Sequence, residues 1–157
     1  MFDKRYITII LSLKDRIKKS KILKQLVEFI KNIDEGDVVY LDDTASNTRA
    51  KAVQSLSNYP FKKTLKELLK AINATSHVSQ DNVVFIISDD KDHLEEFDVK
   101  KMVNKNLFIY KNNEDDFTKL CEKYDVTFKV INLENDLFEN ILEDYYALGD
   151  EEDAISR

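Results

Sequence analysis

Carboxylates gather directly after two apolar runs of this chain and could bind a cation there. They are Asp89, Asp90 and Asp92 after the run Asn82–Ser88, and Asp42 and Asp43 after the run Asp37–Leu41. Mg²⁺ prefers oxygen ligands, so several carboxylates in one crevice would favour its binding. Aspartates at strand ends also cap helices and form turns without any ligand, which is the alternative. For a metal site, Asp89 and Ser12 are the first candidates, because they end two strands that we expect to be neighbours.

Other residue types that carry chemistry are few in this chain. His77 and His93 do not form a metal-spaced pair, and the two glycines form neither a phosphate loop nor a G-x-S-x-G elbow. A phospho-receiver would use Asp42 or Asp43 together with Lys111, but the acidic pair that such a site needs after the first strand is absent. Cys121 lies on an apolar helix stripe, where a buried, inert thiol is expected. We therefore favour a function without catalysis and without a cofactor.

The charge is spread unevenly along the chain. The net charge is −6, yet residues 14–31 hold seven basic and two acidic side chains, and residues 112–157 hold fourteen acidic and four basic ones. Lys14, Lys18, Lys21 and Lys24 recur at three- and four-residue spacing, so a helix would bring them close together. They could contact phosphates, but no aromatic residues lie among them to stack on bases. A protein partner is the favoured ligand of this helix, and a solvated surface is the alternative.

The elements that must position these residues alternate between strands and helices. The run Val83–Ser88 does not alternate in polarity, which is typical of a parallel strand covered on both faces. The predicted strands are Tyr6–Leu13, Asp37–Leu41, Asn82–Ser88, Asn106–Tyr110 and Val126–Ile131. The predicted helices are Asp15–Ile33, Phe61–Ile72, Asp92–Val103, Asp115–Tyr124 and Asn135–Leu148. Within residues 42–59, Lys51–Leu56 is either a short edge strand or a short helix.

This alternation predicts a three-layer α/β fold, with a doubly wound, mostly parallel sheet of about six strands and helices on both faces. One short edge strand would be antiparallel. Tyr6–Leu13 and Asn82–Ser88 should be central neighbours, and their carboxyl ends should flank the switch point, where such sheets bind ligands.

One domain of ordinary size accounts for residues 1–148, and residues 149–157 are predicted to be an acidic, disordered tail. No run of about 18 apolar residues occurs, so no membrane span is expected. A single cysteine fits a reducing compartment, which favours the cytoplasm.

The chain resembles the von Willebrand factor A family over about residues 6–148, in its layout and in three local sequences. They are ITIILSLKDRIKKSKILKQLVEFI for the first strand and helix, NYPFKKTLKELLKAI for a middle helix, and NVVFIISDDKD for the strand before the metal loop. The family binds a metal through a D-x-S-x-S loop, a threonine and an aspartate in a T-D-G-like turn. The turn Ser88-Asp89-Asp90 resembles the last of these, so Asp89 matches its aspartate. The first loop has Ile10, Ser12 and Lys14 where Asp, Ser and Ser stand in the family, which implies a degenerate metal-ion-dependent adhesion site.

A complete α/β scaffold, an uneven charge and no recognisable catalytic set favour a non-enzymatic protein-interaction module that binds its partner without metal. Partner binding is also what the family resemblance implies. The frequent lysine, asparagine and isoleucine are typical of an AT-rich coding source, which favours a small phage or mobile-element regulator. Two alternatives stay open. One is a divalent-metal-dependent phosphoester hydrolase that uses Mg²⁺ at the Asp89 crevice, and the other is a nucleic-acid-binding protein that uses the basic helix.

Overall fold

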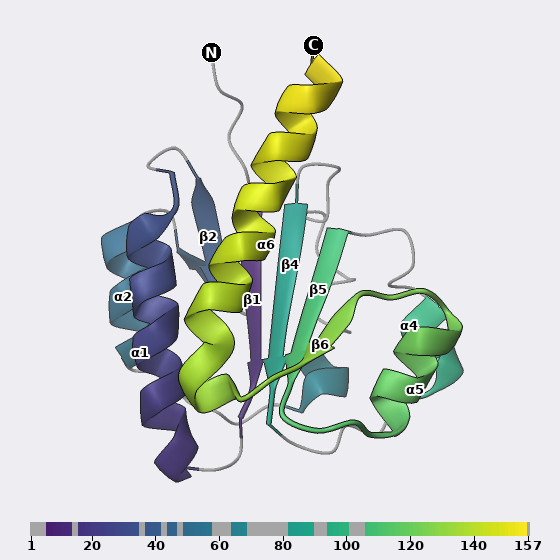
Figure 1. Ribbon diagram of the computed structural model, residues 1–157. Helices are drawn as coiled ribbons and strands as arrows, with labels where there is room; N and C mark the ends of the chain where they lie inside the picture. The colour runs from purple at the N-terminus through teal and green to yellow at the C-terminus, as the bar shows by residue number, and fades with distance from the viewer. Residues whose placement is uncertain are drawn as a thin grey trace.

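In the part of the chain that the structure describes, six strands form one sheet through the middle of the molecule. The computed structural model describes residues 6–13, 16–34, 37–41, 44–46, 49–57, 64–68, 82–89, 94–100 and 106–156. The strands are β1 (Tyr6–Ser12), β2 (Val38–Leu41), β3 (Thr44–Ser46), β4 (Asn82–Ser88), β5 (Asn106–Lys111) and β6 (Phe128–Val130). Their order across the sheet is β3-β2-β1-β4-β5-β6, and only β3 pairs antiparallel (Figure 1).

Helices cover both faces of this sheet, so the predicted three-layer, doubly wound α/β fold is confirmed. They are α1 (Arg16–Asn32), α2 (Arg49–Ser57), α4 (Glu96–Lys100), α5 (Asp116–Lys123) and α6 (Leu133–Ser156), and residues 65–68 are also helical. One core lies between the sheet and α1, α2 and α6. A second core lies between the opposite face and residues 65–68, α4 and α5.

The two central strands are the ones that the sequence predicts. Strands β1 and β4 pair in parallel along their whole length, from Tyr6 opposite Asn82 to Ser12 opposite Ser88. Successive side chains of a strand point to opposite faces. Ile9 and Phe85 therefore join the first core, while Ile10 and Ile86 join the second. Both faces are apolar because both are covered, which explains why neither run alternates in polarity.

The region after β2 decides between two alternatives that the sequence left open. The segment Lys51–Leu56 is helical and not an edge strand, because it lies within helix α2. Ala52 and Leu56 are four residues apart and both fully buried, which is the helical period. The antiparallel edge strand that the sequence predicts does occur, but it is Thr44–Ser46.

Helix α6 is longer than its apolar stripe predicts. The sequence predicts an end at Leu148 and a disordered tail, but the helix continues to Ser156. A glycine inside a helix costs only about 1 kcal/mol, so Gly149 does not stop it. The following glutamates and alanine are good helix formers. Figure 1 shows α6 starting at the carboxyl edge of the sheet, crossing the sheet, and extending beyond the opposite edge.

The side chain of Gln25 on α1 forms hydrogen bonds with the backbone of the first turns of α6. Its Nε2 donates to the carbonyl oxygens of Leu133 at 2.7 Å and Glu134 at 2.6 Å. Its Oε1 accepts from the backbone N–H of Phe138 at 2.9 Å. In a regular helix, that N–H bonds to the carbonyl four residues earlier, which is Glu134. One amide side chain therefore fixes where α6 begins relative to α1.

Replacing this amide is expected to destabilise the protein. Gln25→Ala should lower the free energy of unfolding by about 1–3 kcal/mol, because partly buried backbone groups of α6 lose their partner. Urea denaturation followed by circular dichroism measures this change. Gln54→Ala removes an exposed glutamine from α2 and serves as the control, with an expected effect within about 0.5 kcal/mol. Equal losses in the two variants would contradict the role of Gln25.

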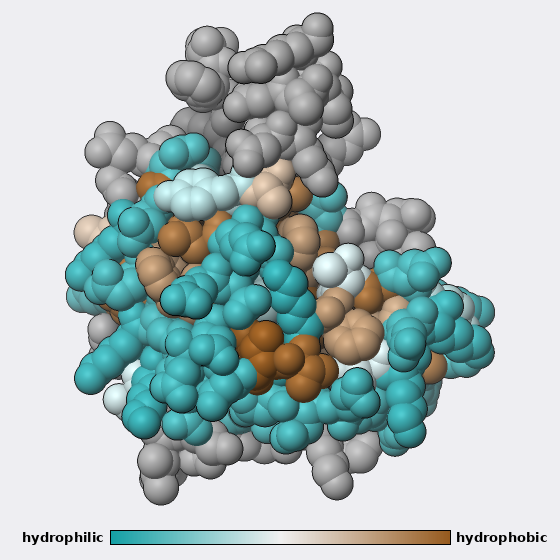
Figure 2. Space-filling view, viewed as in Figure 1, coloured by the Kyte–Doolittle hydropathy of each residue, from teal (hydrophilic) through white to brown (hydrophobic). Residues whose placement is uncertain are grey.

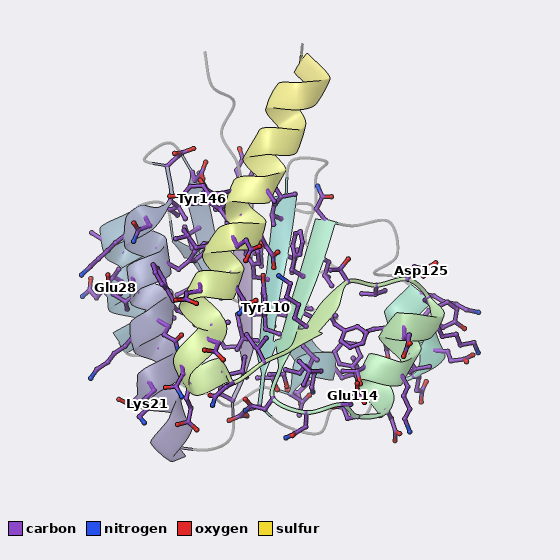
Figure 3. The ribbon with its side chains drawn as sticks, viewed as in Figure 1. Lys21, Glu28, Tyr110, Glu114, Asp125 and Tyr146 are labelled. Atoms are coloured by element: carbon purple, nitrogen blue, oxygen red, sulfur yellow. The ribbon has the colours of Figure 1, made fainter. Side chains whose placement is uncertain are left out.

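Helix α5 ends in a Schellman motif that has aspartate where glycine is usual. The Val126 N–H donates to the Cys121 carbonyl at 2.8 Å, and the Asp125 N–H donates to the Glu122 carbonyl at 3.4 Å. Asp125 has a φ of 57°, and Figure 3 shows it at the turn after α5. The left-handed region is strained for most residues with a Cβ, although aspartate tolerates it better than most.

Asp125→Gly is therefore expected to stabilise the protein. The gain should be about 0.5–1 kcal/mol, because glycine adopts a positive φ without steric cost. Differential scanning calorimetry would show a higher Tm. Asp125→Ala keeps a Cβ and removes the same carboxylate, so it should not raise the Tm. A rise of similar size in both variants would show that charge, and not backbone strain, causes the gain.

Candidate functional site

Three polar side chains lie in one row at the carboxyl edge of the sheet. Ser12 of β1 is opposite Ser88 of β4, and Ser88 is opposite Lys111 of β5. Residues in register on adjacent parallel strands point to the same face, and the strands are about 4.8 Å apart. All three side chains are buried, with exposed fractions of 4%, 0% and 2%. The row crosses the switch point between β1 and β4, where open α/β sheets bind ligands.

A backbone hydrogen bond joins Ser12 and Asp89, the two predicted metal ligands. The backbone N–H of Asp89 donates to the Ser12 carbonyl at 3.2 Å, so the two residues are neighbours across the switch point. Asp89 itself is half-buried. The other four aspartates of the predicted crevice, and both histidines, lie outside the described residues. They are Asp42, Asp43, Asp90, Asp92, His77 and His93.

A buried ion pair stands at the end of this row. The Lys111 Nζ lies 2.7 Å from the Asp115 Oδ2, and their side chains are 2% and 10% exposed. The Nζ also lies 5.7 Å from the centre of the Phe117 ring, within range of a cation–π contact. Asp115 caps α5 as well, because its Oδ1 accepts from the Thr118 N–H at 2.9 Å. One carboxylate thus fixes the lysine and starts the next helix.

Sequence reasoning did not predict this pair. It named Lys111 only as part of a phospho-receiver, and Asp115 only as a residue near a helix start. The available signal was a lysine at the end of an apolar strand, followed four residues later by a helix N-cap. That spacing becomes meaningful only when β5 lies inside the sheet, where the lysine has no route to solvent.

Lys111 does not add a free positive charge to this row, because the Asp115 carboxylate pairs with it at 2.7 Å. Among the described residues, no group of three or more histidine, cysteine, aspartate or glutamate side chains could hold a metal ion. The described part of the chain therefore offers Asp89 and Ser12 as a sparse ligand set for Mg²⁺.

The basic helix is exposed on the same molecule. Lys21 and Lys24 of α1 are exposed, and the Lys21 Nζ lies 3.7 Å from Glu134 at the start of α6. Figure 3 shows Lys21 near the lower end of α1 and Glu28 farther along the same helix. Lys14 and the side chain of Lys18, the other two predicted partner-binding residues, lie outside the described part.

A groove of about 570 Å³ lies between α1 and α2. Its lining combines three apolar side chains with three polar ones: Leu23, Val27 and Leu56, and Ser20, Lys24 and Glu28. Leu56 is fully buried at the base, while Leu23 and Val27 are half-buried. Lys24 therefore joins the basic surface to an apolar floor, a combination that the charge pattern alone did not predict.

A second polar cluster ties α6 to the sheet. The Tyr110 hydroxyl donates to the Asp144 Oδ2 at 2.6 Å, and the Lys129 Nζ lies 3.0 Å from the Asp144 Oδ1. At the next residue of α6, the Tyr145 hydroxyl donates to the Asp37 Oδ2 at 2.6 Å. Figure 3 shows Tyr110 behind α6. Burial, and then the hydrogen bond to a carboxylate, raise the pKa of both tyrosines well above the usual range.

The face that carries α1 and α6 is mostly hydrophilic. Figure 2 shows a small hydrophobic area where β6 leads into α6, a segment that includes Val130, which is 41% exposed. Cys121 is fully buried, as the sequence predicts. None of the helices in the described part of the chain combines the length and the apolar character that crossing a bilayer requires.

Comparison of the chain with models of known protein families and with curated proteins gave no match. Its function must therefore be argued from the geometry above.

Proposed function

We propose that this chain is a protein-interaction module that binds a partner without a metal ion and without catalysis. One observation carries the proposal. At the carboxyl edge of the sheet, where α/β folds bind ligands, the row Ser12–Ser88–Lys111 ends in the buried pair with Asp115. A lysine that is buried and paired within the chain is a structural part of this edge. Among the described residues, Asp89 and Ser12 form a sparse ligand set for Mg²⁺.

The von Willebrand factor A resemblance supports the same proposal. A short antiparallel strand next to β2 is what that resemblance implies, and β3 has this position. In that resemblance Asp89 matches the family's aspartate, whereas Ile10, which matches the first carboxylate, is an apolar, fully buried residue of β1. Without a carboxylate at position 10, the protein would bind its partner without a metal ion. That the protein is a small phage or mobile-element regulator is a finer proposal, which rests on composition.

Affinity capture tests partner binding. The tagged protein, mixed with an extract of its native cells at low salt, is expected to retain a specific protein partner. The same capture in the presence of EDTA should retain it equally, because no metal takes part. Failure to retain any protein under these conditions would overturn the proposal.

A thermal-shift experiment tests the metal-dependent alternative separately. We expect the Tm to stay unchanged in millimolar Mg²⁺ or Mn²⁺, because a ligand that does not bind the folded state cannot stabilise it. A metal-dependent rise in Tm that Asp89→Ala abolishes would favour the hydrolase instead. Asp98→Ala, which removes a carboxylate from helix α4, is the matched control.

A further inference from the structure

The two helices that form the groove, α1 and α2, carry a large excess of positive charge, although the groove lining itself holds one lysine and one glutamate. The two helices together carry eight basic residues and one acidic residue, a net charge of +7. The whole chain has a net charge of −6, so all the other residues together carry −13. Such a local excess of positive charge in an acidic protein attracts negatively charged partners and raises their association rate.

The floor of the groove indicates what kind of partner fits. Leu23 and Val27 are one helical turn apart on α1, and Leu56 of α2 lies with them. A helix that lays its apolar face into a hydrophobic groove uses anchors at the same spacing. Phosphate groups of a nucleic acid would gain nothing from an apolar floor.

The fold itself contains a precedent for this recognition. On another side, α1 already packs against α6, which has nine acidic and no basic residues. Apolar residues of both helices share one core, and Lys21 pairs with Glu134 at 3.7 Å. Helix α1 thus binds an acidic amphipathic helix within the chain, through an apolar stripe flanked by a lysine.

We infer that the groove between α1 and α2 binds an acidic amphipathic helix of a separate protein partner. Apolar anchors of that helix lie over Leu23, Val27 and Leu56, and its carboxylates face Lys24. This inference rests on the proposed function, and it names the surface and the chemical class of the partner.

Two designed peptides test the inference directly. One is a fluorescein-labelled helical peptide with leucine at every third or fourth position and glutamate on both flanks, and the other has lysine in place of each glutamate. By fluorescence anisotropy, the glutamate peptide should bind the full chain at least about tenfold more tightly than the lysine peptide. Added salt should weaken this binding, because the lysines are exposed.

Matched variants locate the binding surface. Lys24→Glu changes an exposed side chain of the groove and should weaken binding of the glutamate peptide about tenfold or more. Lys66→Glu makes the same charge change in the opposite helical layer and should leave the affinity unchanged. Val27→Asp should also abolish binding. If Val27→Asp unfolds the protein, the test rests on Lys24→Glu, whose melting curve should be the same as that of the wild type.

Several results would overturn the inference. They include no binding of either peptide, equal binding by the wild type and Lys24→Glu, or tight binding of a DNA duplex that Lys24→Glu abolishes. Self-association that Lys24→Glu abolishes would assign the groove to a second copy of this chain, and would also overturn it. In the capture experiment, Lys24→Glu could retain a partner as well as the wild type does. That result would contradict binding at the groove, but it would leave the proposed function standing.

Discussion

Asp115→Asn is expected to lower the free energy of unfolding by about 3–5 kcal/mol, the largest loss we predict for a single substitution. The asparagine can still cap α5, because its side-chain oxygen can accept from the Thr118 N–H. What it removes is the negative charge 2.7 Å from the Lys111 ammonium group, which is 2% exposed. A buried charge that loses a counter-ion loses attraction that had offset the cost of its desolvation. Urea denaturation at pH 7 measures the loss.

The partner substitution and the double variant make this prediction specific. Lys111→Met keeps most of the side-chain volume and should cost less, because Asp115 is 10% exposed and keeps its bond to Thr118. The double variant Lys111→Met/Asp115→Asn should be more stable than Asp115→Asn alone, since no buried charge is left unpaired. The coupling energy from the cycle should be roughly 2 kcal/mol or more.

Lys119→Met is the control, because Lys119 is an exposed lysine on α5. Its expected effect is within about 0.5 kcal/mol. Additive losses in the double-mutant cycle would contradict this prediction, because they would mean that the two charges do not interact.

The sequence predicted the sheet well because buried parallel strands leave a simple pattern. The uninterrupted apolar run of β4 is needed because helices cover both of its faces, and its bounds, Asn82–Ser88, agree with the prediction. The same reasoning predicted that Ser12 and Asp89 are neighbours. The segment Lys51–Leu56 was ambiguous because a stretch of six residues is too short to separate the helical from the strand period.

The buried ion pair could not be predicted in the same way. A lysine that ends a strand usually reaches solvent, and the sequence has no mark of burial at Lys111. Its burial depends on the register of three strands and on where α5 begins, and both are set by the tertiary structure. The groove shares this limitation, since the lysines of α1 indicate charge, whereas the apolar floor appears only when α2 packs beside it.

The protein is expected to lose stability steeply above about pH 10. Tyr110 is fully buried and Tyr145 is 3% exposed, and the pKa of each is raised by burial and by a hydrogen bond to a carboxylate. Below about pH 10 both tyrosines hold their protons in the folded and unfolded states alike, so their hydrogen bonds contribute in full. Above that pH only the unfolded chain releases the protons, and unfolding therefore becomes more favourable as the pH rises.

Each of the two tyrosines should remove about 1.4 kcal/mol per pH unit in this range, or roughly 3 kcal/mol per unit together. Urea denaturation from pH 9 to pH 11.5 measures the slope, and absorbance at 295 nm should show both phenols ionising only as the protein unfolds. Tyr145→Phe should reduce the slope by about half, while Tyr146→Phe removes a 52% exposed hydroxyl from the next position and should leave the slope unchanged. Ionisation of all tyrosines before unfolding would show that the contacts with Asp144 and Asp37 do not hold these protons.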